Sequence, residues 1–214
     1  MADDSLTKDL FLFPGFYSTC FVIWTFVLMF ARSGNASSTC VSLPTSPELI
    51  KSFIYSHFVQ LSKTVGEIQA DFAKVRLGNR DYDEYVHRIP QLPRPIWHPD
   101  QLQEETLLQM EIKDLYTFKE FLNEIKSHEK KDSIFLAKFE TIDGEINRLI
   151  GNLKDLEVCR GYQITNQGAS VQPTLKPTAT QKEQDEWELG VLKELLYWFI
   201  PVQGDLYKQL NQKF

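Results

Sequence analysis

Apolar residues recur every three or four positions in four long segments of the chain. That spacing places them on one face of an α-helix, so we expect four amphipathic helices. They cover about residues 46–78, 102–128, 133–158 and 183–212. The positions expected to face the interior are Ile50, Phe53, Ile54, Phe58, Leu61, Val65, Ile68, Phe72 and Val75; Leu108, Ile112, Leu115, Phe118, Leu122 and Ile125; Phe135, Phe139, Ile142, Ile146, Leu149, Leu153 and Leu156; and Val191, Leu192, Leu195, Phe199, Val202, Leu206 and Leu210.

Local signals indicate where these helices begin and bend. The pair Ser46–Pro47 is typical of a helix start, and Asp132 can serve as the N-cap of the third helix. Pro201 should kink the fourth helix, because proline removes a backbone hydrogen bond. Gly144 and Gly151 lie inside the third helix, where they either mark the close approach of another helix or are simply tolerated.

Two long connections and one short turn join the helices, and no segment is typical of a β-strand. Residues 79–101 hold four prolines within ten positions, which excludes a helix or a central strand there. Residues 160–182 are poor in apolar residues, whereas only SHEKKD separates the second and third helices. A short turn joins antiparallel neighbours, and a long connection can carry the chain back across the bundle. We therefore expect an all-α, long-chain four-helix bundle with up-up-down-down topology and two long crossover loops.

The first 33 residues are expected to be a signal peptide. Leu10–Ala31 is a run of 22 residues without a charge, followed by small residues that suit cleavage after Ser33 or Ala36. The alternatives are a retained single-pass anchor and a buried helix, because such a run is also long enough to span a bilayer. Asn35 begins the one N-x-S/T sequon, which can carry a glycan only if it remains after processing.

The three cysteines bear on the same topology. Cys20 lies in the apolar run and would leave with a signal peptide, whereas Cys40 precedes the first helix and Cys159 ends the third. In up-up-down-down order these last two positions share one end of the bundle, so a disulfide between them is sterically reasonable. One disulfide is expected in a secreted chain, and two free thiols are the alternative.

Composition and motifs favour a binding module over an enzyme. The net charge of −6 opposes a nucleic-acid surface, which needs concentrated Lys and Arg. The chain has no phosphate-binding glycine loop, nucleophile elbow or zinc-protease motif. The histidines are scattered without metal-ligand spacing at His57, His87, His98 and His128. We expect no catalytic activity, cofactor, metal or small-molecule substrate.

Two segments of the chain carry a recognisable motif. In the fourth helix the pattern is V-L-x-E-L-x-x-W, then Asp-Leu seven residues after that Trp, at Val191, Leu192, Glu194, Leu195, Trp198, Asp205 and Leu206. In the second helix the segment is QMEIKDLYTFKEFLNEI. Both segments resemble those of interleukin-6-family cytokines, closest to the branch of ciliary neurotrophic factor, cardiotrophin-like cytokine and leukaemia inhibitory factor. The resemblance covers the architecture of residues 46–212 but only about 40 residues in sequence. A disulfide between the segment before the first helix and the third helix also resembles one in leukaemia inhibitory factor.

The resemblance implies an extracellular ligand that is monomeric before it binds and that crosslinks receptor ectodomains. One receptor surface would lie on the outer faces of the first and third helices. The polar residues opposite the expected apolar stripes are Ser56, Gln60, Lys63, Glu67 and Lys74, and Lys138, Thr141, Glu145, Arg148 and Asn152. A solvated face explains each of them singly, and as a set they are candidates for contact with the shared signal-transducing receptor.

A second surface, at the start of the fourth helix, would meet the leukaemia inhibitory factor receptor. Family members carry F-x-x-K there, at positions that Lys182 and Asp185 occupy in this chain. The motif is therefore absent, and Trp187 or Trp97 could supply the aromatic anchor. Core packing is an equally good explanation of Trp187.

Two other classes of protein remain open. A membrane-anchored helical bundle would retain residues 10–31 and serve adhesion or structure. A four-helix carboxylate metalloprotein would need inward Glu and Glu-x-x-His pairs, whereas the expected inner stripes are uniformly apolar.

Overall fold

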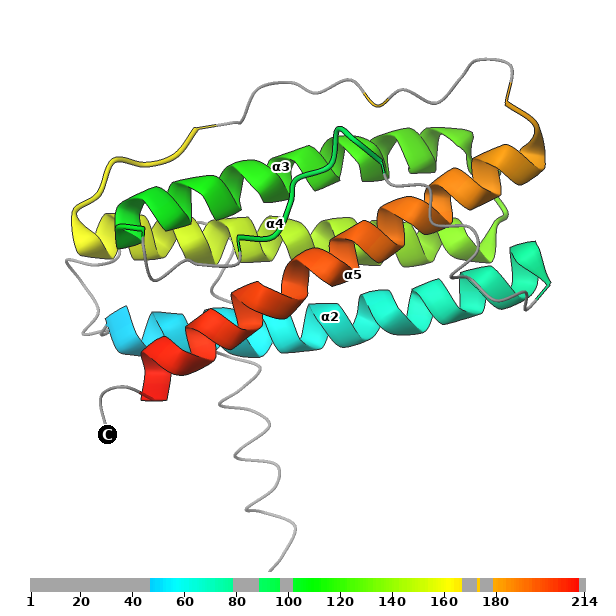
Figure 1. The fold of residues 1–214 in the computed structure, drawn as a ribbon. Coiled ribbons are helices and arrows are strands. Elements are labelled where there is room, and N and C mark those ends of the chain that lie inside the picture. The colour runs from blue at the N-terminus through cyan, green and yellow to red at the C-terminus, as the bar shows by residue number, and fades with distance from the viewer. Residues whose placement is uncertain (1–46, 79–88, 97–101, 167–172, 174–178, 212–214) are drawn as a thin grey trace, which may run out of the picture. The chain divides into compact units, whose positions relative to one another are not determined.

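The four apolar segments of the sequence form four helices in the structure, a computed structural model that describes residues 47–78, 89–96, 102–166, 173 and 179–211 (Figure 1). The helices are α2 (Pro47–Leu77), α3 (Glu104–His128), α4 (Ile134–Arg160) and α5 (Gln181–Asn211). No strand occurs in the described part of the chain. The predicted all-α class with four helices is confirmed for these residues.

Glycines end two of the helices where the sequence changes character. Gly78 follows α2 with φ 71°, and Gly161 follows α4 with φ 72°. Glycine adopts this left-handed conformation without the strain that a Cβ brings, and it commonly ends helices for that reason. After α4, the backbone N–H of Tyr162 also donates to the Glu157 carbonyl at 2.9 Å, which satisfies a carbonyl in the last turn.

The N-cap of α4 is Ser133, so the assignment of Asp132 to that position is wrong. Ser133 has an extended backbone, and its hydroxyl accepts a hydrogen bond from the Phe135 N–H at 3.1 Å. A capping side chain must reach the free N–H groups of the first helical turn. Ser133, one residue after Asp132, is the residue whose side chain does so.

Ser133→Ala is expected to lower the free energy of unfolding by about 1 kcal/mol, because one N–H at the start of α4 loses its acceptor. Asp132→Ala is the matched control and should change stability by less than about 0.5 kcal/mol. Urea unfolding followed by circular dichroism measures both. Equal losses in the two variants would contradict this cap assignment.

The interior contains nearly all of the predicted apolar positions, with two corrections in α2. Phe53 is 40% exposed and Val75 is 60% exposed, although both were expected to be buried. Each residue of a helix is turned about 100° from the one before it, so Phe53 points away from the core that its neighbour Ile54 enters. The side chains of Leu206 and Leu210 lie outside the described residues. The buried apolar residues that the stripes missed include Ala73, Leu107, Phe121, Ile150, Leu189 and Trp198.

Large aromatic rings fill the middle of the core. Trp198 lies 6.0 Å from Phe58, 5.8 Å from Phe118 and 5.6 Å from Phe199, measured between ring centroids. Its indole N–H donates to Asp114 Oδ2 on α3 at 3.0 Å. Trp198 therefore combines tight packing with a hydrogen bond for its single polar atom, as a buried tryptophan requires.

The glycines inside α4 do not mark a close helix approach. A Cβ added at Gly144 or Gly151 would meet no heavy atom within 4 Å. This favours simple tolerance. In α2, by contrast, a Cβ added at Gly66 would lie 3.9 Å from the Leu196 side chain of α5.

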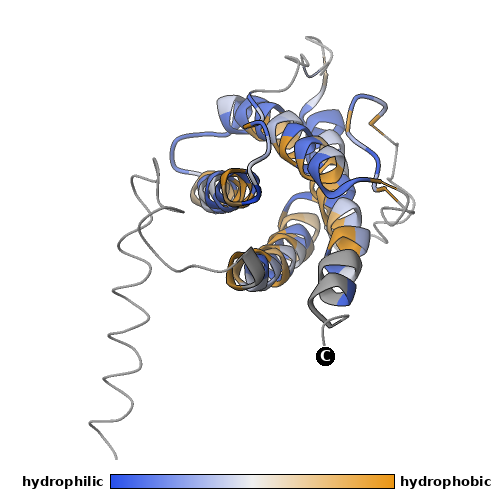
Figure 2. Ribbon diagram, turned by 90° about the vertical axis from the view of Figure 1, so that its left-hand side faces the viewer, coloured by the Kyte–Doolittle hydropathy of each residue, from blue (hydrophilic) through white to orange (hydrophobic). Residues whose placement is uncertain are grey.

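The helices surround a common interior, as the view along them in Figure 2 shows. Helix α2 packs against α4 and α5, whereas α3 packs mainly against α4. From the connection between α2 and α3, Ile89 and Leu92 also enter the core. The arrangement leaves the outer sides of α2 and α4 on adjoining surfaces, and it brings polar side chains together at both ends of the bundle.

Candidate functional site

The polar residues predicted on α2 and α4 lie on neighbouring outer surfaces. On α2, the predicted residues Ser56, Gln60, Lys63, Glu67 and Lys74 are all exposed. On α4, Thr141 and Arg148 are exposed, and Lys138, Glu145 and Asn152 are half-buried beside α2. Since α2 and α4 are packing neighbours, we define the α2–α4 face as these ten residues together with His57.

His57 joins the two halves of the α2–α4 face. Its Nε2 lies 2.5 Å from Glu145 Oε2, and its Nδ1 lies 3.2 Å from Asn152 Nδ2. Both contacts are satisfied when Nε2 carries a proton and donates it, while Nδ1 accepts from the amide. Glu145 also accepts from Arg148 at 2.6 Å. These contacts hold the polar side chains of α4 in fixed positions on the face.

His57 is a member of this face that sequence reasoning missed. It was considered only as a metal ligand, and its partners lie 88 and 95 positions away in the chain. Helical periodicity indicates which side of a helix faces outward, but it does not indicate which helix lies beside it. No signal in the sequence alone pairs His57 with Glu145.

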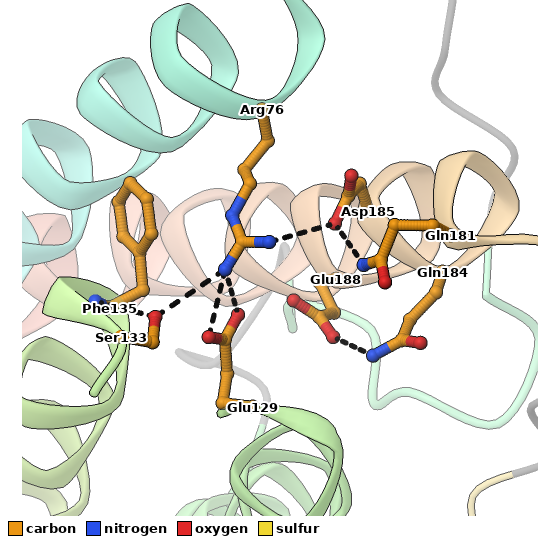
Figure 3. A network of polar contacts seen from close by, with 8 residues as sticks. All are labelled: Arg76, Glu129, Ser133, Phe135, Gln181, Gln184, Asp185 and Glu188. Carbon is orange, nitrogen blue, oxygen red and sulfur yellow. Dashed lines mark hydrogen bonds and ion pairs between the residues drawn. The ribbon is translucent and has the colours of Figure 1, made fainter. Parts of the chain in front are cut away.

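A second polar site lies where α2 ends and α5 begins (Figure 3). We call it the Arg76 cluster: Arg76, Glu129, Ser133, Asp185 and Glu188. Arg76 Nη2 donates to both carboxylate oxygens of Glu129 at 2.9 Å and to the Ser133 hydroxyl at 3.4 Å. The Nη1 atom faces Asp185 Oδ1 at 3.9 Å. One guanidinium therefore links α2, the turn between α3 and α4, and α5.

The two acids that α5 contributes to the cluster are buried. Asp185 is 5% exposed and Glu188 is 0% exposed. Burial raises the pKa of Asp185, although its bond from Gln181 and the charge of Arg76 act in the opposite direction. Burial raises the pKa of Glu188 to about 8, against the effect of the hydrogen bond that Gln184 donates to it at 2.9 Å. Glu188 is thus mostly protonated at neutral pH.

The predicted site residues at the start of α5 separate into surface and interior. Lys182 is exposed, and its Nζ lies 3.6 Å from Glu186 Oε1. Asp185 was predicted to face a receptor, but its carboxylate points inward to Arg76, so its burial opposes direct contact with a partner. Trp187 is half-buried and stacks on Phe121 with centroids 5.8 Å apart, which makes packing its main structural role.

Several predicted positions lie outside the described residues, namely Trp97, Asn35, Cys40, His87, His98 and the apolar segment 10–31. Cys159 is half-buried against the core, and its pairing with Cys40 stays a prediction. Across the residues that the structure describes, no group of three or more His, Cys, Asp or Glu side chains could hold a metal ion. None of the described helices is long and apolar enough to cross a membrane.

Comparisons with protein families, with curated proteins and with solved structures found no match to this chain.

Proposed function

We propose that the protein is a secreted helical cytokine that binds and crosslinks class I cytokine receptor chains to trigger intracellular signalling. The α2–α4 face is the observation that supports this proposal most strongly. It presents charged and polar side chains of both signs from two neighbouring helices, several of them held by contacts between the helices. Polar and charged side chains of this kind are typical of the rim of a protein interface. The receptor at this face would be the shared signal transducer of the interleukin-6 family.

The up-up-down-down topology is part of the proposal, and contacts at the helix ends support it. The starts of α2 and α3 meet through Lys51 and Glu104. The end of α4 lies beside the same start of α3, because Arg160 Nε is 3.4 Å from Glu104 Oε2. At the other end of the bundle, Arg76 reaches from the end of α2 to Asp185 at the start of α5. These contacts support a topology in which α2 and α3 run parallel, and α4 and α5 run antiparallel to them.

A second receptor chain, of the leukaemia inhibitory factor receptor type, would bind near the start of α5. Asp185 is turned inward, so this contact would rest on Lys182, the half-buried Trp187 and the segment around Trp97. Tryptophan provides much of the binding energy in many interfaces, which makes these two aromatic residues the first to test.

Receptor-dependent phosphorylation tests the proposed function directly. Purified protein is added to responsive cells and to lines that lack one candidate receptor chain each. Signalling should be lost in the line that lacks the shared signal transducer. If signalling is also lost in a line that lacks another receptor chain, that chain is the second partner. A protein that gives no phosphorylation in any line and binds none of the receptor ectodomains would refute the proposal.

Charge changes on the α2–α4 face are expected to weaken signalling at least tenfold in half-maximal concentration. Gln60→Arg and Arg148→Glu each alter an exposed side chain, and a loss of about 1.4 kcal/mol of binding free energy corresponds to that factor. Asn123→Arg changes an exposed residue of α3 and is the matched control. Thermal melts should show only small differences in stability among the three variants, because the ion pair that Arg148→Glu removes is an exposed one. Unchanged signalling in both face variants would remove this face from the receptor contact.

A membrane-anchored bundle is the second candidate, and the 22 uncharged residues Leu10–Ala31 favour it. Sequencing the amino terminus of the protein collected from culture medium distinguishes the two. A secreted product should begin near Gly34 or Ser37, whereas a cell-bound product with an intact Met1 would support the anchored form.

A further inference from the structure

The first two turns of α5 are attached to the bundle partly through the Arg76 cluster. Residues 181–188 supply Asp185 and Glu188 to it, each with a neighbouring glutamine as hydrogen-bond donor (Figure 3). Another attachment is the stack of Trp187 on Phe121. The apolar core residues of α5 begin just beyond, at Leu189. The polar cluster therefore contributes to how firmly this end of α5 is held.

The cluster contains three carboxyl groups and a single guanidinium. Arg76 directs Nη2 to Glu129 and Nη1 to Asp185, which accounts for both of its terminal nitrogens. Glu188 receives its hydrogen bond from a neutral amide, and its Oε2 atom has no hydrogen-bond partner among the described residues. An ionised carboxylate without a compensating cation is expensive in a buried site, whereas a protonated carboxyl group is much less so.

We propose that the Arg76 cluster is a proton-dependent latch, which holds the start of α5 against the bundle while Glu188 is protonated and loosens it when Glu188 ionises. The charged groups that face Glu188 are Arg76 from α2, Glu129 from the cap of α3 and Asp185 from α5 itself. The start of α4 contributes Ser133, whose hydroxyl is neutral. This latch does not depend on the proposed function, since it follows from contacts within the chain alone.

The direction of the pH effect follows from where Glu188 binds its proton. In the closed latch, burial and the negative charges of Glu129 and Asp185 raise the pKa of Glu188 to about 8, from an ordinary value of 4.5. Between these values the closed state holds a proton that the open state releases. Opening therefore becomes more favourable as the pH rises through this window, and the effect levels off above the pKa of the closed state.

Amide hydrogen exchange read by mass spectrometry tests the latch on the purified chain. Peptides that cover residues 181–190 are compared at about pH 6 and about pH 8, after correction for the intrinsic pH dependence of exchange. With the pKa of Glu188 at about 8 in the closed state and near 4.5 in the open state, the opening constant is expected to increase about fiftyfold between the two conditions. Peptides from the middle of α3 serve as the internal reference and should change much less.

Two variants make the result specific to Glu188. Glu188→Gln keeps the shape of the protonated side chain and cannot ionise, so most of the pH dependence of its corrected exchange should be lost. Glu186→Gln, on the same turn and half-buried, should retain the pH dependence of the original chain. Equal opening of the unaltered chain at both pH values would overturn the latch. Persistence of the full pH dependence in Glu188→Gln would overturn it as well.

Discussion

Trp198→Ala is expected to lower the free energy of unfolding by about 4 kcal/mol, within the range measured for large aromatic truncations in cores. The side chain is fully buried among Phe58, Phe118 and Phe199, so its removal leaves a cavity that rigid neighbours cannot fill. Urea unfolding followed by circular dichroism measures the loss. Tyr197→Ala is the matched control, because this adjacent aromatic residue is 46% exposed, and it should cost less than about 1 kcal/mol.

The hydrogen bond of Trp198 can be separated from its packing by Trp198→Phe. This variant keeps an aromatic ring but removes the N–H that donates to Asp114. Burial raises the pKa of Asp114 to about 6, and the Trp198 bond acts against that shift. Its loss should raise the pKa of Asp114 further and cost about 2 kcal/mol at neutral pH, where the carboxylate is charged. A Trp198→Phe loss as large as that of Trp198→Ala would show that the hydrogen bond, and not the cavity, dominates.

The helices could be predicted from the sequence because helical periodicity is a local property. The sequence shows three or four apolar residues per two helical turns, whatever those residues contact in the fold. Glycines such as Gly78 mark the ends of helices. The errors arise where the outcome depends on tertiary packing. Val75 fits the spacing of the α2 stripe, yet its side chain is 60% exposed. The sequence shows Trp198 only as part of a motif and does not predict its burial. A residue beside the apolar stripe is buried only if another helix covers that side.

The candidate sites divide in the same way. The outward positions of α2 and α4 follow from periodicity, so residues such as Gln60 and Arg148 were assigned correctly to exposed surfaces. Residue type alone favours solvent exposure for a carboxylate, and this rule fails for Asp185 and Glu188. Asp185 faces Arg76, which lies more than 100 positions earlier in the chain, and Glu188 is buried beside this pair. No local pattern indicates such a distant partner, and composition favours the exposed alternative for any single glutamate.

Arg76→Leu is expected to lower the free energy of unfolding by about 3–5 kcal/mol, since removal of one partner leaves buried carboxylates without a cation. The Glu129 side chain is only 3% exposed, and Asp185 is also buried. The guanidinium carbon also lies 5.5 Å from the centroid of the Phe135 ring, in a cation–π contact. Leucine can pack against this ring but has no charge to attract it. Urea unfolding at neutral pH gives the magnitude. Lys74→Leu, an exposed position on the last turns of the same helix, is the matched control and should change stability little.

Neutralising the acids should recover much of the stability that Arg76→Leu removes. In the triple variant Arg76→Leu, Glu129→Gln, Asp185→Asn no buried charge lacks a partner, and replacement of a whole ionic group is often close to neutral. The single variant should also lose less stability at about pH 5 than at about pH 8, because its unpaired carboxyl groups can take up protons in acid and thereby avoid the buried charge. A triple variant no more stable than Arg76→Leu, with no pH dependence in the single variant, would mean that Arg76 acts through packing on Phe72 and Phe135 and not through its charge.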